Sequence, residues 1–185
     1  MGKEFSSILP QHEEFIKQQR VFFVGSAPKS VDGHVNISPK GYDSFRILSR
    51  TEVAYLDLTG SGNETSAHLH ENGRITMMFA AFDGKPMILR LYGKGSVILP
   101  DTPEWDDIVD HFELQHGARQ IIYAKIDTVK TSCGYSIPYY SYEGERDTLK
   151  QWADNKNDEE MEAYHKKKNA VSMDGIVTPI GERNK

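Results

Sequence analysis

The stretch at residues 60–66 (GSGNETS) carries residue types that could hold a phosphate, between a predicted strand and a predicted helix. Glycine lets the backbone turn sharply and approach a ligand closely. Asn63, Thr65 and Ser66 add polar side chains at the start of the helix, where free backbone N–H groups and the helix dipole favour an anion. The stretch therefore predicts a phosphate site, and the alternative is a plain turn with a helix cap. GxxxxGK[ST] and GxGxxG are both missing, which argues against a P-loop or a Rossmann fingerprint.

Two basic residues could add positive charge to such a site. Lys40 follows residues 35–39 (VNISP) where the chain is expected to turn, and it either supplies a point charge to a phosphate or is solvated. Arg90 alternates with Leu89 and Leu91 along a predicted strand, so it lies on the other face. It either points to solvent or meets an anion.

Other kinds of chemistry find little support. Residues 133–140 (CGYSIPYY) place a cysteine near three tyrosines, and aromatic rings often line sites for flat ligands. Cys133 has no evident partner that would lower its pKa, so it is not expected to be a nucleophile. His68 and His70 fall on different faces of the predicted helix, and HExxH, CxxC and GxSxG are missing. We therefore assign no metal site and no catalytic residue.

Composition limits the class of protein. The chain has 185 residues, 38% of them hydrophobic, which fits one globular domain of ordinary size. A net charge of −5 argues against a non-specific nucleic-acid binder, which needs a basic surface. The single cysteine fits a reducing compartment. With no signal peptide and no long apolar run, the expected location is cytoplasmic, without membrane contact.

Short strands and a few helices are predicted in an irregular order. The expected strands are residues 21–24, 33–37, 52–58, 74–81, 87–99 and 120–129, and the expected helices are residues 10–19 and 64–72 and one beginning at Pro103. Because the helices do not alternate with the strands, this order disfavours a parallel doubly wound sheet. It favours a mainly β, α+β fold: a six-stranded antiparallel barrel with short flanking helices.

The composition changes after about residue 145. Leu149 and Trp152 fall on a predicted helix, residues 154–169 are almost all polar or charged, and residues 170–185 are expected to form a loosely held tail. We therefore expect a barrel domain over residues 1–145 and a C-terminal helical segment with a flexible tail over residues 146–185.

Taken in order, these segments resemble the pyridoxamine 5′-phosphate oxidase-like family of FMN-binding split barrels, from about residue 14 to residue 142. Residues 54–79 (AYLDLTGSGNETSAHLHENGRITMMF) match its order of strand, phosphate turn, helix and strand. Residues 84–98 resemble the hairpin that follows, and residues 133–138 resemble the end of the barrel. The resemblance implies a six-stranded split barrel that forms a homodimer with FMN between the subunits.

The resemblance also implies a set of cofactor-binding residues. They comprise a strand under the flavin ring, the end of a second strand, the phosphate turn and two positions contributed by a partner subunit: Val35, Asn36, Ile37, Ser38 and Lys40; Leu58 and Thr59; Asn63, Glu64, Thr65 and Ser66; Arg90 and Trp152.

The sequence departs from the family's pattern in the phosphate turn. True pyridoxamine phosphate oxidases have an arginine and a lysine where this chain has Glu64 and Thr65, so only the backbone N–H of Glu64 is expected to contribute. The family's substrate-binding arginine and histidine near the C-terminus have no clear match. Oxidation of pyridoxamine phosphate itself is therefore not expected.

The implied function is that of an FMN-dependent oxidoreductase, which passes hydride or electrons between the flavin and a small molecule. A nicotinamide nucleotide, NAD(P)H, is the expected reductant. The alternatives are a non-catalytic protein that binds flavin, haem or a deazaflavin, and a barrel without ligand that serves as an interaction protein, because a fold alone does not determine a function.

Overall fold

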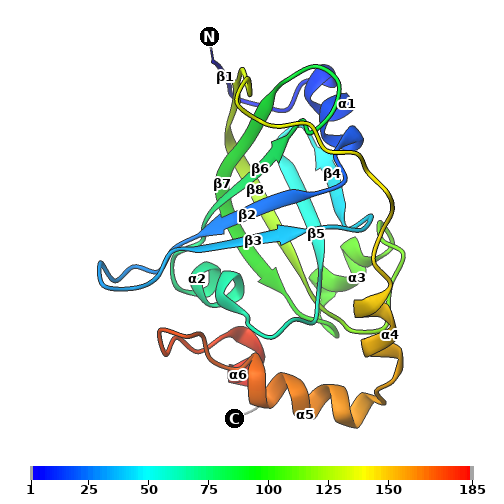
Figure 1. Cartoon of the computed structure of the whole chain (residues 1–185). Coiled ribbons are helices and arrows are strands. Elements are labelled where there is room, and N and C mark those ends of the chain that lie inside the picture. The colour runs from blue at the N-terminus through cyan, green and yellow to red at the C-terminus, as the bar shows by residue number, and fades with distance from the viewer. Residues whose placement is uncertain (1, 184–185) are drawn as a thin grey trace.

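The computed structural model describes residues 2–183 and contains a sheet of eight strands surrounded by short helices (Figure 1). The strands are β1 (Lys3–Phe5), β2 (Phe22–Ser26), β3 (Asn36–Lys40), β4 (Phe45–Ser49), β5 (Glu52–Leu58), β6 (Arg74–Ala80), β7 (Ile88–Ile98) and β8 (Ala118–Ser132). The helices are α1 (Pro10–Gln18), α2 (Glu64–Asn72), α3 (Pro103–Val109), α4 (Thr148–Asp154), α5 (Asp158–Lys168) and α6 (Pro179–Arg183).

The sheet is curled into a split barrel. Its strands follow the order β3-β2-β6-β7-β8-β5-β4, with β1 paired to β8, and all pairs are antiparallel. β3 and β4 are the two ends of this order, yet Lys40 of β3 forms an ion pair with Asp57 of β5 at 2.6 Å. The predicted antiparallel split barrel is confirmed, with more strands than expected.

Apolar side chains fill the barrel, and a smaller group lies under α3. Aromatic rings of Phe22, Phe45, Tyr55 and Phe79 contact one another inside the barrel, with ring centroids between 5.0 and 5.5 Å apart. The second group is formed by the opposite face of β5 and the apolar side of α3, including Trp105. β5 is therefore buried on both faces.

Local sequence signals account for the ends of the helices that lie near the barrel. α2 ends at Gly73, which has a φ of 71°, a conformation that glycine adopts without steric cost. α3 begins after Thr102, whose side chain accepts a hydrogen bond from the backbone N–H of Trp105, and Pro103 occupies its first position. β5 and α2 have the predicted bounds.

The strands that differ most from the prediction are β1, β3 and β4, and β8 also extends beyond its predicted residues 120–129 at both ends. β1 and β4 were not expected, because each is short and shows no alternation of buried and exposed residues. β3 begins at Asn36 rather than at residue 33 and continues through Pro39, which lies opposite Phe23. A proline is tolerated there because β3 is an edge strand and one side of it needs no backbone donor.

The expectation of a loosely held tail beyond residue 170 is wrong for the residues that the structure describes, which end at residue 183. α5 begins with a capping box between Asn157 and Glu160. Asn169 and Thr178 are fully buried, and α6 buries Ile180. In Figure 1, α5 and α6 lie beneath α2. No helix within residues 2–183 is both long and apolar enough to span a membrane.

Candidate functional site

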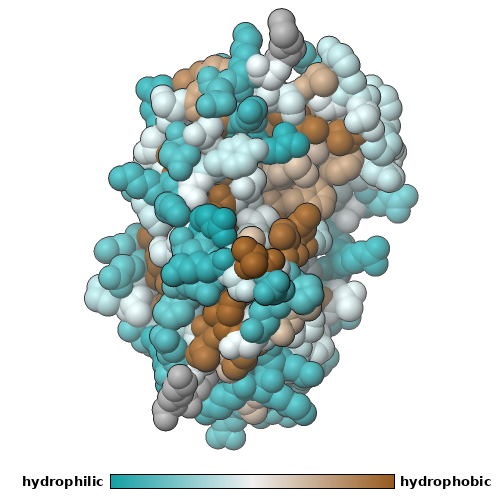
Figure 2. All heavy atoms as spheres, turned by 90° about the vertical axis from the view of Figure 1, so that its left-hand side faces the viewer, coloured by the Kyte–Doolittle hydropathy of each residue, from teal (hydrophilic) through white to brown (hydrophobic). Residues whose placement is uncertain are grey.

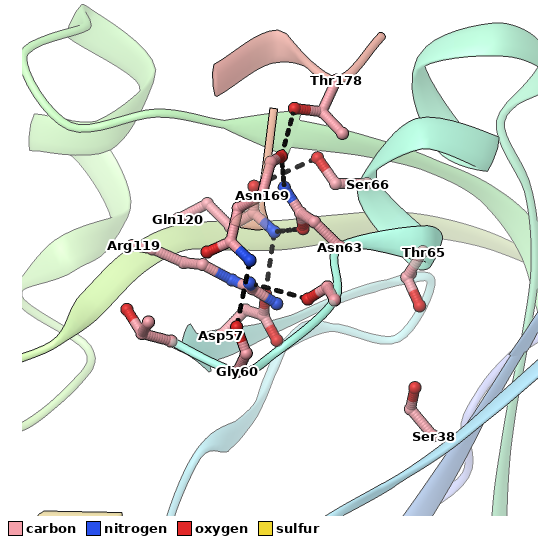
Figure 3. A network of polar contacts seen from close by, with 12 residues as sticks. Ser38, Asp57, Gly60, Asn63, Thr65, Ser66, Arg119, Gln120, Asn169 and Thr178 are labelled. Atoms are coloured by element: carbon pink, nitrogen blue, oxygen red, sulfur yellow. Dashed lines mark hydrogen bonds and ion pairs between the residues drawn. The ribbon is translucent and has the colours of Figure 1, made fainter. Parts of the chain in front are cut away.

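Asp57 is the centre of a buried polar network near the start of α2 (Figure 3). Its carboxylate accepts hydrogen bonds from Lys40 Nζ at 2.6 Å, Arg119 Nε at 2.9 Å and Gln120 Nε2 at 2.7 Å. Alternation along β5 places Asp57 on the same face as the buried Tyr55. The apolar barrel therefore changes at this end into a charged interior.

The network holds Asp57 in its ionised form. Burial by itself raises the pKa of this carboxyl, but the positive charges of Arg119 and Lys40, with hydrogen bonds from Lys40 and Gln120, bring it below its usual value of 3.8. These two cations share one carboxylate, so one positive charge in the group is uncompensated. This excess charge favours an anion nearby.

The first turn of α2 has no side-chain cap. Asn63 occupies the N-cap position, but its Oδ1 accepts a hydrogen bond from Gln120 Nε2 at 2.8 Å and its Nδ2 donates to the backbone oxygen of Asn169 at 3.1 Å. Within residues 2–183, no group accepts a hydrogen bond from the backbone N–H of residues 64–66. These N–H groups and the helix dipole can hold an anion.

Hydroxyl and amide groups from β3 and α2 meet beside this helix end. Asn36 Nδ2 donates to Thr65 Oγ1 at 3.0 Å, and the hydroxyls of Thr65 and Ser38 point toward one another (Figure 3). The hydroxyl of Tyr55 is buried near Thr65 and forms no well-made hydrogen bond to the described residues. Hydrogen-bonding capacity is therefore left for a ligand here.

The turn before α2 is fixed by hydrogen bonds on one side, and free space lies next to its backbone at Gly60. Arg119 Nη1 donates to the backbone oxygen of Gly62 at 2.9 Å, and both carboxylate oxygens of Glu64 accept from the backbone N–H of Met173 at 3.2 Å. A Cβ atom added to Gly60 would meet no described atom within 4 Å. A ligand could therefore approach this backbone, while the carboxylate of Glu64 is bound to the C-terminal residues.

His165 of α5 also reaches the turn. Thr59 Oγ1 lies 2.7 Å from the backbone oxygen of Gly117 and 2.8 Å from His165 Nε2. Because the hydroxyl has one proton and donates it to the carbonyl oxygen, His165 Nε2 must be the donor to Thr59. Burial, and then the charge of Arg119, lower the pKa of His165. A lower pKa favours the neutral imidazole, which carries its proton on Nε2 here.

The residues expected under a flavin ring are Val35, directly before β3, and residues of β3 itself, and their side chains alternate between the two faces of this strand. Asn36, Ser38 and Lys40 point toward the network described above. Val35 and Ile37 are 72% and 70% exposed and point away from it. One strand therefore offers polar groups to the inside of the barrel and apolar groups to the outside.

Three of the other expected cofactor-binding residues have their side chains away from the turn before α2 of the same chain. Leu58 packs in the apolar group under α3. Arg90 Nη1 donates to Ser132 Oγ at 3.1 Å on the outer face of β7, as its alternation with two buried leucines predicts. Trp152 of α4 contacts the ring of Tyr164 edge to face, with centroids 4.9 Å apart. The role of Arg90 and Trp152 across a dimer stays a prediction.

Replacing Ser66 with alanine is expected to lower the stability of the protein rather than its affinity for an anion. The Ser66 hydroxyl is fully buried and donates to Gln120 Oε1 at 3.1 Å, so its removal leaves a buried acceptor without a partner. We expect the free energy of unfolding to fall by about 1–2 kcal/mol in urea titrations. Ser61→Ala, at an exposed position of the same turn, is the control. An unchanged stability of Ser66→Ala would contradict this role.

Several residues of the network were not predicted from the sequence. Asp57 carries a usable signal, because it continues the inward face of an alternating strand, where a carboxylate needs a partner. Arg119 and Gln120 begin β8 and are more than fifty residues from Asp57 along the chain. Asn169 lies in a polar stretch and carries no signal of this kind.

Known proteins resemble this chain in sequence and in fold. Residues 8–133 match the family model described as pyridoxamine 5′-phosphate oxidase. A pyridoxamine 5′-phosphate oxidase family protein, ustO of Aspergillus flavus, is 43% identical over 138 residues, which cover 72% of this chain. The match spans only 55% of that relative's length.

Two solved structures show a similar fold. The H111A variant of HupZ from Group A Streptococcus has a TM-score of 0.56 and 17% identity, covering 68% of this chain and 99% of that chain. The FAD binding protein from Mycobacterium smegmatis has a TM-score of 0.50 and 12% identity, covering 68% of this chain and 96% of that one. At these identities the likeness concerns the fold alone.

Proposed function

This chain belongs to the pyridoxamine 5′-phosphate oxidase family, and we propose that it binds FMN with the phosphate at the start of α2. The observation that carries this proposal is the uncapped helix end. The N-cap residue Asn63 forms its side-chain hydrogen bonds with Asn169 and Gln120 instead of with the helix. Free backbone N–H groups at a helix start form an anion site without requiring the arginine and lysine that true pyridoxamine phosphate oxidases have there.

Neighbouring side chains complete the proposed phosphate site. The hydroxyls of Ser38 and Thr65 and the amide of Asn36 supply hydrogen bonds, and the excess positive charge of Lys40 and Arg119 lies in the adjoining network. Hydrogen bonds to a charged group are stronger than those between neutral groups. The residues that are present therefore fit a phosphate.

We infer further that the protein is an oxidoreductase. When bound, FMN supplies hydride and electron transfer through its isoalloxazine ring. The protein's part is to bind and orient the cofactor. Residues 35–38 are the proposed contact with the ring, and their backbone lies next to the phosphate site. Asp57 is not free to move a proton, because its carboxylate is paired with two cations. A small molecule and a nicotinamide nucleotide are the proposed reaction partners.

The absorption spectrum of the purified protein tests the cofactor directly. We expect bands at about 370 and 450 nm, either as purified or after addition of FMN and gel filtration. A sharp Soret band would instead identify haem as the ligand. A colourless protein that retains no added FMN would contradict the proposal.

An exposed apolar patch supports the proposed homodimer. It consists of side chains from the loop before β3, from β3 itself and from the C-terminal residues: Val31, Val35, Ile37, Val171 and Met173. The loop before β3 and the C-terminal residues are joined by a hydrogen bond between His34 Nδ1 and Asp174 Oδ1 at 2.6 Å. Figure 2 shows hydrophobic side chains gathered among polar ones on the side of the molecule to which these segments project. Such patches mark protein interfaces.

Replacing Ile37 with aspartate is expected to convert the dimer into a monomer. The substitution places a charge in the middle of the proposed interface, where no partner is available. Light scattering after gel filtration measures the mass, and Leu114→Asp, at another exposed apolar side chain, is the control. A wild-type protein of monomeric mass with FMN bound, or an Ile37→Asp variant that stays dimeric, would contradict this interface.

A further inference from the structure

The C-terminal segment, residues 157–183, packs against the turn at residues 60–63 (Figure 1). It lies entirely outside the part of the chain that matches the family model, which ends at residue 133. Its side chains are mostly polar, so apolar burial alone does not account for its position. Its contacts with the turn are hydrogen bonds.

Asn169 is the residue of this segment that touches both ends of the turn. It is fully buried, its Nδ2 donates to the backbone oxygen of Gly60 at 3.0 Å, and its backbone oxygen accepts from Asn63 Nδ2 at 3.1 Å. The same backbone oxygen accepts from the buried Thr178 Oγ1 at 2.7 Å, which ties Asn169 to the residues before α6 (Figure 3). The turn and the segment are therefore joined by buried contacts.

These contacts change what the start of α2 can bind. An asparagine at an N-cap usually accepts a hydrogen bond from the second or third N–H of its own helix. Here the backbone of Asn169 and the side chain of Gln120 hold the amide of Asn63 away from that role. The backbone N–H of Met173 likewise binds the carboxylate of Glu64, the one negative side chain in the first turn. The C-terminal segment therefore keeps the carboxylate of Glu64 away from the helix end by itself, and together with Gln120 it keeps the amide of Asn63 away from it.

We propose that the C-terminal segment is a positioning element of the phosphate site, and that Asn169 is its principal positioning residue. The segment leaves the N–H groups of residues 64–66 available to an external anion. Through Met173 it also binds the carboxylate of Glu64 away from these groups. This inference rests on the proposed function for its ligand, the phosphate of FMN. The arrangement of the turn itself can be measured without any ligand.

Asn169→Ala in the 185-residue chain tests the proposal. Without FMN, we expect hydrogen exchange at the amide of Ala67, which donates to the backbone oxygen of Asn63 at 3.1 Å, to become at least about tenfold faster, because a buried hydrogen bond that holds the turn is lost. Fluorescence titration should show FMN affinity about tenfold weaker, the ratio that corresponds to one such bond. Asn157→Ala is the matched control, since it removes the cap of α5 but has no contact with the turn.

Thr178→Val provides a second variant of similar shape, in case the first does not fold. It removes the hydroxyl that binds the backbone oxygen of Asn169 and should shift exchange and affinity in the same direction. Unchanged exchange at the amide of Ala67 in both variants would overturn the positioning role. Faster exchange with wild-type FMN affinity would overturn its link to the phosphate. A wild-type protein that binds no FMN would overturn the proposed function, while the exchange data would still decide whether the segment holds the turn.

Discussion

Replacing Asp57 with asparagine is expected to lower the free energy of unfolding by about 3 kcal/mol or more. Asp57 is the shared acceptor for Lys40 and Arg119, and Arg119 is itself almost fully buried. Without the carboxylate, two positive charges remain close together away from water, with no compensating charge. Urea denaturation at neutral pH measures the effect.

Asp43→Asn is the control for this prediction. Asp43 pairs with Arg46, but its side chain is 87% exposed, so its loss should leave the unfolding midpoint nearly unchanged. Acid provides a second check. Since the pKa of Asp57 is lower in the folded state, its stabilisation is present above the usual value of 3.8 and is lost as the pH falls below about 4. The difference between wild type and Asp57→Asn should therefore shrink in acid, and a constant difference would contradict the assignment.

Replacing Thr65 with aspartate is expected to abolish most FMN binding while the protein stays folded. A carboxylate near the start of a helix is favourable for the helix itself. The same carboxylate would occupy the proposed position of the phosphate, and like charges in contact cost several kcal/mol. We expect the Kd for FMN to rise by at least about 100-fold in a fluorescence titration, with circular dichroism showing that the variant is still folded.

Two controls separate charge repulsion from other effects. Thr65→Val removes only the hydroxyl and should weaken FMN binding by about tenfold, the ratio expected for a single hydrogen bond. Ser96→Asp adds the same charge at an exposed position of β7 and should leave the affinity as it is. If Thr65→Asp bound FMN as tightly as wild type, the phosphate would not lie at the start of α2.

Local patterns in the sequence were enough to predict most of the barrel. β5 and α2 have the predicted bounds because their signals are local. Alternation of apolar residues marks β5, and a polar helix start and Gly73 mark the two ends of α2. β1 and β4 lack such signals, and their pairing depends on neighbours that are distant in sequence. The order of the segments was also enough to indicate the family.

The sequence by itself therefore determined the barrel, the position of the glycine-rich turn and the presence of a helix directly after it. Only the tertiary structure decided which side chains surround that turn. Asp57, Arg119 and Asn169 come together although at least 50 positions of the chain separate each from the next. Periodicity reports which face of an element is buried, whereas hydrogen bonds between polar residues distant in sequence leave no periodic trace. For the same reason a polar C-terminal segment resembled a loose tail, although it is held against the turn by buried hydrogen bonds.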